Sequence, residues 1–330
     1  MTFPDNYGTM RISNFGKKGI VLQEQIFIDQ NKTCLKGNLH THTNLSDGKY
    51  ATSDVLKMYE ENSYDFIGIS DHDLYYVPEE HPNGLIVLAG QEVSCVYIGD
   101  PGHCGGYVHF SCFLRKKDPV LPMQYRNAEE LQQCLDVLKE HYRLVQFNHP
   151  LFSSMFADLR DEEIVSLDGY HFLELYNYKD FRNETGLPCA EIMVRRILNA
   201  HKKVLLTAGD DFHGPYKKSA NDYLGGGYIM LCAEKNEESI LRALENGDFY
   251  ATTGPKILDY RRIGNRFIIK TTPVKNIIFY SNVRRCKNIM TDDNADITVG
   301  EYDVRDGDFY VWVKAVDAEG KTAWAQPVYL

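Results

Sequence analysis

The sequence lacks the marks of a disulfide scaffold and of a membrane protein. Its eight cysteines include no C-x-x-C pair and are dispersed over the chain, so we expect reduced thiols rather than a disulfide framework or a thiolate zinc site. No apolar run approaches membrane-spanning length, and the first residues lack the charged-then-apolar pattern of a signal peptide. We therefore expect a cytoplasmic protein without membrane contacts.

Basic residues are few relative to acidic ones. The chain has 36 Lys and Arg against 46 Asp and Glu, a formal net charge of −10, which disfavours nucleic acid as the main partner. Neither G-x-S-x-G nor G-x-x-x-x-G-K-S/T occurs, so a nucleophile-elbow serine hydrolase and a nucleotide-binding P-loop are also disfavoured. We expect a small-molecule substrate instead.

The order of sequence patterns predicts a large and a small domain. With 330 residues the chain can bury a substantial core. Short apolar runs alternate with helical patterns over residues 37–253, which is typical of an α/β domain. Alternating segments separated by turn residues over 254–330 predict a small antiparallel β-sandwich. Residues 1–36 precede both as an N-terminal lead-in segment, in which two apolar stretches favour a hairpin.

The stretch from Asn38 to Asp73 holds the first candidate site residues. If the chain is extended there, the side chains of His40 and His42 point to the same side and can bind one ion. A second polar cluster, S-D-H-D with His72, directly follows the apolar run Phe66–Ile69, a predicted buried strand. Ionisable groups at a strand end are costly to bury unless paired, and a metal ion is the usual partner.

The same pattern recurs along the α/β part of the chain. An intervening helix, capped by Thr52 or Ser53, would bring the first two clusters to one sheet edge. The loop before Tyr107 is too short for a helical crossover, which favours a local antiparallel pair there. Because strand ends gather residues around one cavity in barrels, we predict a closed or distorted seven-stranded α/β barrel. The seven strand ends lie near His40, His72, Glu92, His109, His149, Glu174 and Asp211.

Six short motifs follow one another along the first two thirds of the chain. They are H-T-H at 40–42, S-D-G at 46–48, S-D-H-D at 70–73, Q-E-V-S at 91–94, N-H-P at 148–150 and D-F-H at 211–213. In type and order, these motifs resemble those of the PHP (polymerase and histidinol phosphatase) superfamily over residues 37–214. The resemblance implies a distorted (β/α)7 barrel that holds a di- or trinuclear metal cluster. Two segments near the C-terminus, F-Y-A-T-T-G-P and A-W-A-Q-P-V-Y, are similar to two-domain members of the carbaryl-hydrolase-like branch.

The resemblance also implies roles for individual residues. The first ion would be bound by His40, His42, Glu92 and Asp211. Glu92 would bridge to a second ion that is also bound by His109, with His103 as the alternative in the same segment, and by His149. The third ion would be bound by Asp47, His72 and His213. Glu92, Asp211 and His213 would be catalytic as well, and Asp210 would be an outer carboxylate or a loop cap.

The chemistry of these side chains supports several metal ions. Imidazole and carboxylate without thiolate suit Zn, Mn or Fe, and nine candidate ligands exceed the four to six that one ion typically takes. We therefore expect two or three divalent ions as cofactors. Two neighbouring ions can hold a bridging hydroxide that attacks a phosphate ester.

Our leading hypothesis is a metal-dependent phosphoesterase acting on a small phosphate ester. Lys179 and Arg182 are candidates for binding the phosphate, and Asn177 and Tyr176 for contacting the leaving group. One alternative is a carboxylic or carbamic ester hydrolase, and another is a non-catalytic metal-binding module. Two or more cations in the cavity would favour phosphate, whereas an aromatic, uncharged cavity would favour the neutral ester.

Overall fold

The chain divides by spatial packing into two compact units. A computed structural model of the protein describes residues 9–13, 22–29, 31–79, 84–99, 106–151, 161–183, 189–214, 224–282 and 285–330. The central unit comprises Lys36–Ile229, and the terminal unit comprises Met1–Leu35 with Met230–Leu330. The domain boundaries expected at 36/37 and 253/254 stay predictions, because residues that pack together need not form a domain that folds independently.

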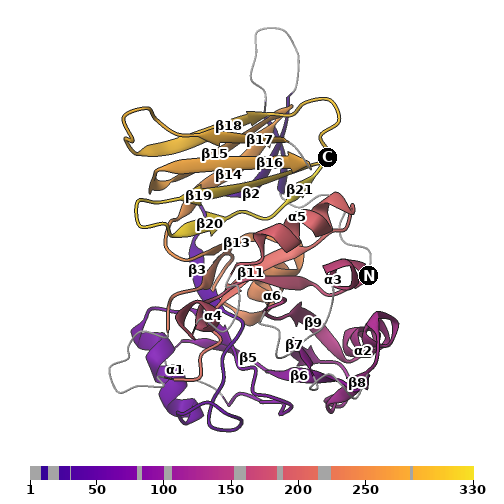
Figure 1. Cartoon of the computed structure of the whole chain (residues 1–330). Coiled ribbons are helices and arrows are strands. Elements are labelled where there is room, and N and C mark those ends of the chain that lie inside the picture. The colour runs from indigo at the N-terminus through magenta and orange to yellow at the C-terminus, as the bar shows by residue number, and fades with distance from the viewer. Residues whose placement is uncertain are drawn as a thin grey trace. The chain divides into compact units, whose positions relative to one another are not determined.

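The central unit contains most of its strands in one mixed sheet (Figure 1). The antiparallel pair predicted near Tyr107 is confirmed, since β6 runs antiparallel to β7, and β9, β10 and β11 then pair in parallel. In sheet order, the strands are β11 (Leu205–Gly209), β10 (Phe172–Asn177), β9 (Tyr142–Phe147), β7 (Tyr107–Arg115), β6 (Gly90–Tyr97) and β8 (Met123–Tyr125).

A second set of parallel strands carries the first two polar clusters. It consists of β3 (Cys34–Asn38), β4 (Phe66–Gly68) and β5 (Ile86–Leu88). Two isolated parallel bridges, Thr41 with Phe212 and His72 with Glu92, join the ends of β3 and β4 to the mixed sheet. Among the described residues, the strands thus form separate sheets that meet at bridges, and no continuous closed barrel is formed.

The helices of the central unit cover its apolar strands. On α1, Val55, Leu56 and Tyr59 are buried against Ile67 and Phe212. The predicted side-chain cap by Thr52 or Ser53 is wrong, because Ala51 occupies the N-cap and makes no side-chain cap bond. The helices are α1 (Thr52–Glu61), α2 (Ala128–His141), α3 (Asp161–Ser166), α4 (Tyr178–Asn183) and α5 (Glu191–Asn199).

The terminal unit is built mainly of antiparallel strands, drawn in gold and yellow at the top of Figure 1. One helix, α6 (Glu237–Asn246), is capped by Asn236 and ends at Gly247 with φ +73°. The first sheet is β1 (Thr9–Ser13), β2 (Leu22–Ile28), β14 (Ile257–Ile263), β15 (Arg266–Val274) and β18 (Ile297–Asp303). The other strands are β17 (Arg285–Ile289), β16 (Asn276–Asn282), β19 (Tyr310–Val316), β20 (Thr322–Trp324) and β13 (Phe249–Thr252), with β21 (Val328–Tyr329) on β19; β12 (Tyr228–Cys232) spans the boundary between the two units.

The lead-in segment belongs to the first sheet of the terminal unit. β1 and β2 pair antiparallel, and β2 continues onto β14. The ring of Phe27 stacks on that of Phe267 with centroids 6.1 Å apart. β2 therefore shares a core with residues more than 230 positions later, which no local sequence pattern could indicate. None of the described helices is long and apolar enough to cross a membrane.

Candidate metal centre

The predicted metal ligands lie at the ends of neighbouring strands, and backbone bonds hold these ends together. The amide of His42 donates to the carbonyl of Phe212 (2.9 Å), and the amide of Glu92 donates to the carbonyl of Asp71 (3.0 Å). The amide of Asn148 donates to the carbonyl of His109 (3.1 Å). Ligand-bearing segments that are far apart in the sequence are thereby fixed side by side, because each is a hydrogen-bonded neighbour of another.

The carboxylate of Glu92 lies at the centre of this arrangement and is fully buried. Burial disfavours its ionised form, yet the imidazoles of His109, His40 and His72 hold the pKa of Glu92 well below its usual range. An ionised carboxylate that is surrounded by imidazoles can serve as a ligand to more than one cation. Its oxygens lie close to ring nitrogens of His40 (3.3 Å), His42 (3.3 Å), His72 (3.2 Å), His109 (3.4 Å) and His149 (3.5 Å).

Asp211 supplies a second buried carboxylate. Its Oδ1 lies 3.3 Å from His40 Nε2, 3.2 Å from His42 Nε2 and 3.3 Å from His213 Nδ1. The backbone of Asp211 has φ +50°, a left-handed conformation that aspartate tolerates better than most residues and that often marks functional sites. The conformation aims the carboxylate at the histidines rather than along the strand.

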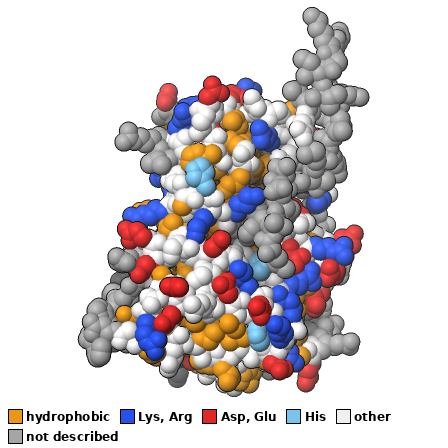
Figure 2. All heavy atoms as spheres, turned by 90° about the vertical axis from the view of Figure 1, so that its right-hand side faces the viewer, with side chains coloured by type: hydrophobic (Ala, Val, Ile, Leu, Met, Phe, Trp, Pro, Cys, Tyr) orange, Lys and Arg blue, Asp and Glu red, His pale blue; other side chains and the backbone are white. Residues whose placement is uncertain are grey.

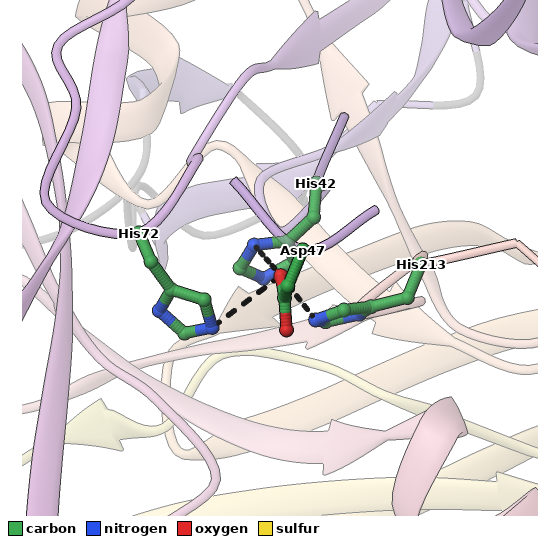
Figure 3. A group of neighbouring side chains, drawn as sticks. All are labelled: His42, Asp47, His72 and His213. Atoms are coloured by element: carbon green, nitrogen blue, oxygen red, sulfur yellow. Dashed lines mark ion pairs between the residues drawn. The ribbon is translucent and has the colours of Figure 1, made fainter. Parts of the chain in front are cut away.

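Asp47 completes a group at the solvent side. Figure 3 shows its carboxylate among the rings of His42, His72 and His213. Oδ1 lies 3.7 Å from His42 Nδ1, 3.8 Å from His72 Nε2 and 3.1 Å from His213 Nε2. Its side chain is 55% exposed, whereas that of His42 is buried. This is therefore the most accessible ligand group of the cluster.

The ligand atoms form four overlapping groups, each compact enough for one ion. They combine the nine predicted ligands, and His40, His42, His72 and Glu92 each belong to two groups. The groups are His42, Asp47, His72 and His213; His40, Glu92 and His149; His40, His42 and Asp211; and His72, Glu92 and His109. The grouping resembles the predicted three sites, with His42 also near the third.

Unpaired polar atoms in the cluster show that divalent cations fit it. Both ring nitrogens of His42, Oε2 of Glu92, Nδ1 of His109 and Oδ1 of Asp211 are buried without a hydrogen-bond partner. Such atoms cost free energy unless they are paired, and cations bound within the four groups would pair them. Burial, with repulsion from His213, lowers the pKa of His42 well below its usual value, which favours the neutral imidazole that binds metal. The donors suit Zn, Mn or Fe.

Glu174 orients the first histidine from behind. Its Oε1 lies 2.9 Å from Nδ1 of His40, so that Nε2 faces Glu92 and Asp211. Its Oε2 accepts hydrogen bonds from the amide of His149 (2.8 Å) and from Nδ2 of Asn177 (3.1 Å). A carboxylate behind a ligating imidazole fixes its tautomer and raises its basicity. The sequence placed Glu174 at a strand end but gave no sign of this role.

Asn148 orients Glu92 in a similar way. Its Nδ2 donates to Oε1 of Glu92 (2.5 Å) and to the hydroxyl of Ser111 (2.8 Å). Its Oδ1 accepts from Nε2 of Gln146 (2.9 Å), and Gln146 accepts from the hydroxyl of Thr207 (2.8 Å). This buried chain of hydrogen bonds holds the central carboxylate in one orientation.

Asp210 faces away from the cluster. It accepts hydrogen bonds from the amides of residues 225–227 (2.9–3.1 Å) and from Nδ2 of Asn38 (2.8 Å). The hydroxyls of Tyr59 and Tyr64 add two more. Burial raises the pKa of Asp210 to about 6, although the glycine amides act in the opposite direction. These contacts are those of a loop cap.

A cavity opens over the cluster. Its volume is about 170 Å³, below the roughly 300–1,000 Å³ of typical small-molecule sites, so a larger substrate would extend beyond it. Sequence reasoning missed Tyr107, although it lies two positions before His109 on β7 and alternation places both on one face. The lining residues are Asp47, His72, Glu92, Tyr107, His109, His149, Lys179 and Asp211.

The four predicted substrate-binding residues differ in their positions. Nζ of Lys179 lies at the cavity, 3.5 Å from Oδ1 of Asp211 and 3.1 Å from Nε2 of His213. Asn177 is buried, and its Nδ2 donates to Glu174 and Asp211 (3.2 Å), which makes it a support for the ligands. Tyr176 forms an isolated bridge with Cys189 and is not one of the residues that line this cavity.

Two further predicted positions lie outside the described residues. They are the side chain of Arg182, whose backbone is in α4, and His103, the alternative to His109. His109 itself joins the cluster. Among the described residues, Lys179 is thus the one cation that lines the cavity, and a phosphate-binding role for Arg182 stays a prediction.

The face of the molecule drawn in Figure 2 carries charged side chains of both signs. On the face of the molecule drawn in Figure 2, Lys and Arg side chains lie among Asp and Glu side chains, and no broad area carries basic side chains alone. Proteins that bind nucleic acid usually present a basic stripe or patch. This face therefore agrees with the acidic composition of the whole chain.

Comparison with known proteins gives structural likeness only. No family model and no curated protein matches the chain. It is similar to a two-domain protein from Bacteroides vulgatus containing a predicted PHP-like metal-dependent phosphoesterase, at 15% identity and a TM-score of 0.48, over 87% of this chain and 92% of the other. It is also similar to a proposed metal-dependent phosphoesterase from Bifidobacterium adolescentis (14% identity, TM-score 0.38, 58% and 92%). An amidohydrolase from Chromobacterium violaceum matches at 13% identity and a TM-score of 0.35 (55% and 88%).

Proposed function

We propose that this chain is a PHP-like metal-dependent phosphoesterase that hydrolyses a small phosphate ester at the cavity over Glu92. The observation that carries the proposal is the cluster itself: four overlapping ligand groups with buried atoms that lack partners. A structural role would not need so many unpaired ligands around an open cavity, because buried polar groups are normally satisfied within the protein.

The barrel expected from the sequence is part of this proposal. Strand pairing runs from β11 through β10, β9 and β7 to β6. The bridge from His72 to Glu92 leads to β4, β4 pairs with β3, and the bridge from Thr41 to Phe212 returns to the end of β11. These seven strands trace an incomplete ring, which is what a distorted (β/α)7 barrel would leave if its ladder were broken at two places. The predicted metal ligands lie at the ends of these strands, where barrel enzymes place their active sites.

We infer that two or three divalent ions, of Zn, Mn or Fe, are held by the nine clustered ligands. Such ions would lower the pKa of a coordinated water and neutralise the charge that develops on phosphate oxygens. The protein's own side chains hold the ions in place: Glu92 and Asp211 contribute negative charge, and Glu174 and Asn148 orient the ligands from behind.

The side chains at the cavity mouth supply positioning and proton transfer. The ammonium of Lys179 lies beside Asp211 and His213, where it can bind a phosphate oxygen and stabilise negative charge. Asp211 lies beside the ammonium of Lys179 and within the ligand groups, so its charge helps to hold Lys179 and the ions in place. His213, next to both, can donate a proton to the leaving oxygen.

One observation favours a second candidate, hydrolysis of a neutral carboxylic or carbamic ester. The cavity contains one described cation and the exposed aromatic ring of Tyr107. A neutral ester would need less positive charge than a phosphate and would gain from contact with the ring. The two candidates share the metal ligands and differ in the electrophile.

The test is hydrolysis by protein loaded with Mn, Zn or Fe, using matched nitrophenyl esters. We expect nitrophenyl phosphate or its diester to be cleaved, nitrophenyl acetate to be cleaved much more slowly, and His40→Ala to lose metal and activity together. Faster cleavage of the acetate would favour the neutral ester. Tight metal binding without hydrolysis of any substrate would favour a non-catalytic metal-binding module.

A further inference from the structure

Two of the dispersed cysteines come together in the terminal unit. Cys34 begins β3 and Cys232 ends β12, and these strands are neighbours in the sheet. Their sulfurs lie 3.9 Å apart across 198 positions of sequence. Both are free thiols in the structure. The distance is that of two thiols in contact, and neighbouring strands are spaced about 4.8 Å apart, which suits the 4.4–6.8 Å between α-carbons of a disulfide.

We propose that Cys34 and Cys232 form a reversible disulfide in response to hydroperoxides, with Cys34 as the attacking thiol and Cys232 as the resolving thiol. The sulfurs must approach by roughly 1.9 Å to reach a bond of about 2.05 Å. The site is separate from the metal ligands and does not depend on the proposed hydrolysis.

The two thiols differ in access and in acidity. Cys34 is partly exposed, whereas Cys232 is buried. The contact with Cys232 lowers the pKa of Cys34 to about 7; burial acts in the opposite direction, and the Lys256 ammonium adds to the lowering. Roughly half of Cys34 is then thiolate at neutral pH, and the thiolate is the nucleophile in thiol oxidation. The partly exposed thiol therefore reacts first.

The oxidation can be written with all atoms balanced. The Cys34 thiolate attacks one oxygen of hydrogen peroxide, an S–O bond forms as the O–O bond breaks, and the sulfur is oxidised by two electrons to a sulfenic acid. The second oxygen leaves as hydroxide and takes up a proton. The Cys232 sulfur then attacks Cys34, an S–S bond forms as the S–O bond breaks, and the thiol proton leaves with the oxygen as water. A small dithiol reverses the step by exchange.

Other thiols in the described chain are poorer candidates. Cys95 and Cys134 interact with each other, but Cys95 is fully buried and Cys134 nearly so, so peroxide has little access to either. Cys286 is exposed and serves as the matched control, because it tests whether exposure alone decides reactivity.

The test treats the full-length protein with hydrogen peroxide at pH 7 and maps peptides without reduction. We expect a Cys34–Cys232 crosslink that dithiothreitol reverses, and oxidation of Cys34 about tenfold faster than that of Cys286, because Cys34 has a neighbouring thiol and a nearby ammonium that favour its reactive thiolate. In Cys232→Ser, Cys34 should stop at the sulfenic acid and be trapped by dimedone. Cys286→Ser should leave the crosslink unchanged.

The wild-type peptide map decides the question even if a variant does not fold. Absence of the crosslink, or oxidation of Cys34 no faster than that of Cys286, would overturn the proposal. A pH profile adds an independent readout: alkylation of Cys34 should rise with a midpoint near pH 7, and an ordinary thiol midpoint of about 8.5 would contradict the assignment.

Discussion

The two units of the protein treat buried charge in opposite ways. In the terminal unit, Arg261 makes a two-pronged ion pair with the buried Asp259 and a further contact from Nη1 to Oε1 of Glu24 (2.8 Å). In the central unit, Glu92 and Asp211 are just as buried, yet each keeps an oxygen without a hydrogen-bond donor. In the terminal unit a guanidinium pairs with the buried carboxylate, whereas in the central unit several imidazoles and the ammonium of Lys179 surround carboxylates that keep oxygens without hydrogen-bond partners.

The difference teaches where to look for chemistry in a chain of this kind. A buried carboxylate paired with a guanidinium is unavailable for binding, and the fold is destabilised when that partner is removed. A buried carboxylate that faces several imidazoles and keeps an oxygen without a hydrogen-bond partner has the chemistry of a metal ligand. The following predictions test this contrast, and the largest effect comes first.

Glu92→Gln should remove the central charge while keeping the shape of the side chain. We expect it to lose at least one bound ion and to lower hydrolytic activity by more than about 100-fold, beyond the 10–100-fold typical for residues that only orient a ligand. Metal content and initial rates measure both effects. Glu61→Gln, at an exposed position of α1, is the control; retention of metal and activity in Glu92→Gln would break the contrast.

Glu174→Gln should have a smaller effect, because Glu174 contacts His40 from behind. An amide in its place can keep one hydrogen bond but loses the charge that fixes the tautomer of His40. We expect metal affinity to fall about 10–100-fold, with stoichiometry restored at high metal concentration. Calorimetric titration measures this, and a loss of sites that excess metal does not restore would mean that Glu174 is itself a ligand.

Arg261→Met should affect the terminal unit alone. Removal of the guanidinium leaves Asp259 buried without its partner, which costs about 2–4 kcal/mol when the pair is largely buried. Denaturant unfolding, read by hydrogen exchange in residues 257–274, measures the loss. Metal content should equal that of the wild type, and a drop in metal content would show that the two units are not independent in this respect.

Acidification should remove metal from the central unit at a pH at which the terminal unit is still folded. The effect on the stability of the terminal unit should be the smallest of the predicted effects. A histidine binds metal as the neutral imidazole, so protons compete with metal for these ligands, and metal should be released progressively as the pH falls below about 7. In the terminal unit, burial disfavours ionisation of Asp308, yet hydrogen bonds from Tyr302 and the amide of Arg305 lower its pKa. A carboxylate with a lowered pKa adds stability above its unfolded value of about 3.9 and loses it as the pH falls further.

Metal content and hydrogen exchange, followed over the same pH range, check this order. Protection of the terminal unit should persist at pH 5, after the metal has gone. Simultaneous loss of metal and of protection in both units would contradict it.

The candidate site could be predicted further than the fold. Strand-end histidines and carboxylates are local patterns, and all nine cluster in space. The roles of Glu174 and Asn177 depend on which strands become neighbours, and no spacing in the sequence reveals that. The same holds for the pairing of β2 with β14 and for the contact between Cys34 and Cys232. A closed or distorted barrel was expected, and strand order alone does not show where its ladder is interrupted.

The most direct measurement is elemental analysis of the purified wild-type protein beside Glu92→Gln. If the residues around Glu92 are a metal centre, the wild type will bind two or three divalent ions per chain after dialysis, and the variant will bind fewer. A wild type that binds less than one ion per chain when supplied with Zn, Mn and Fe, or a variant with the same content, would contradict it.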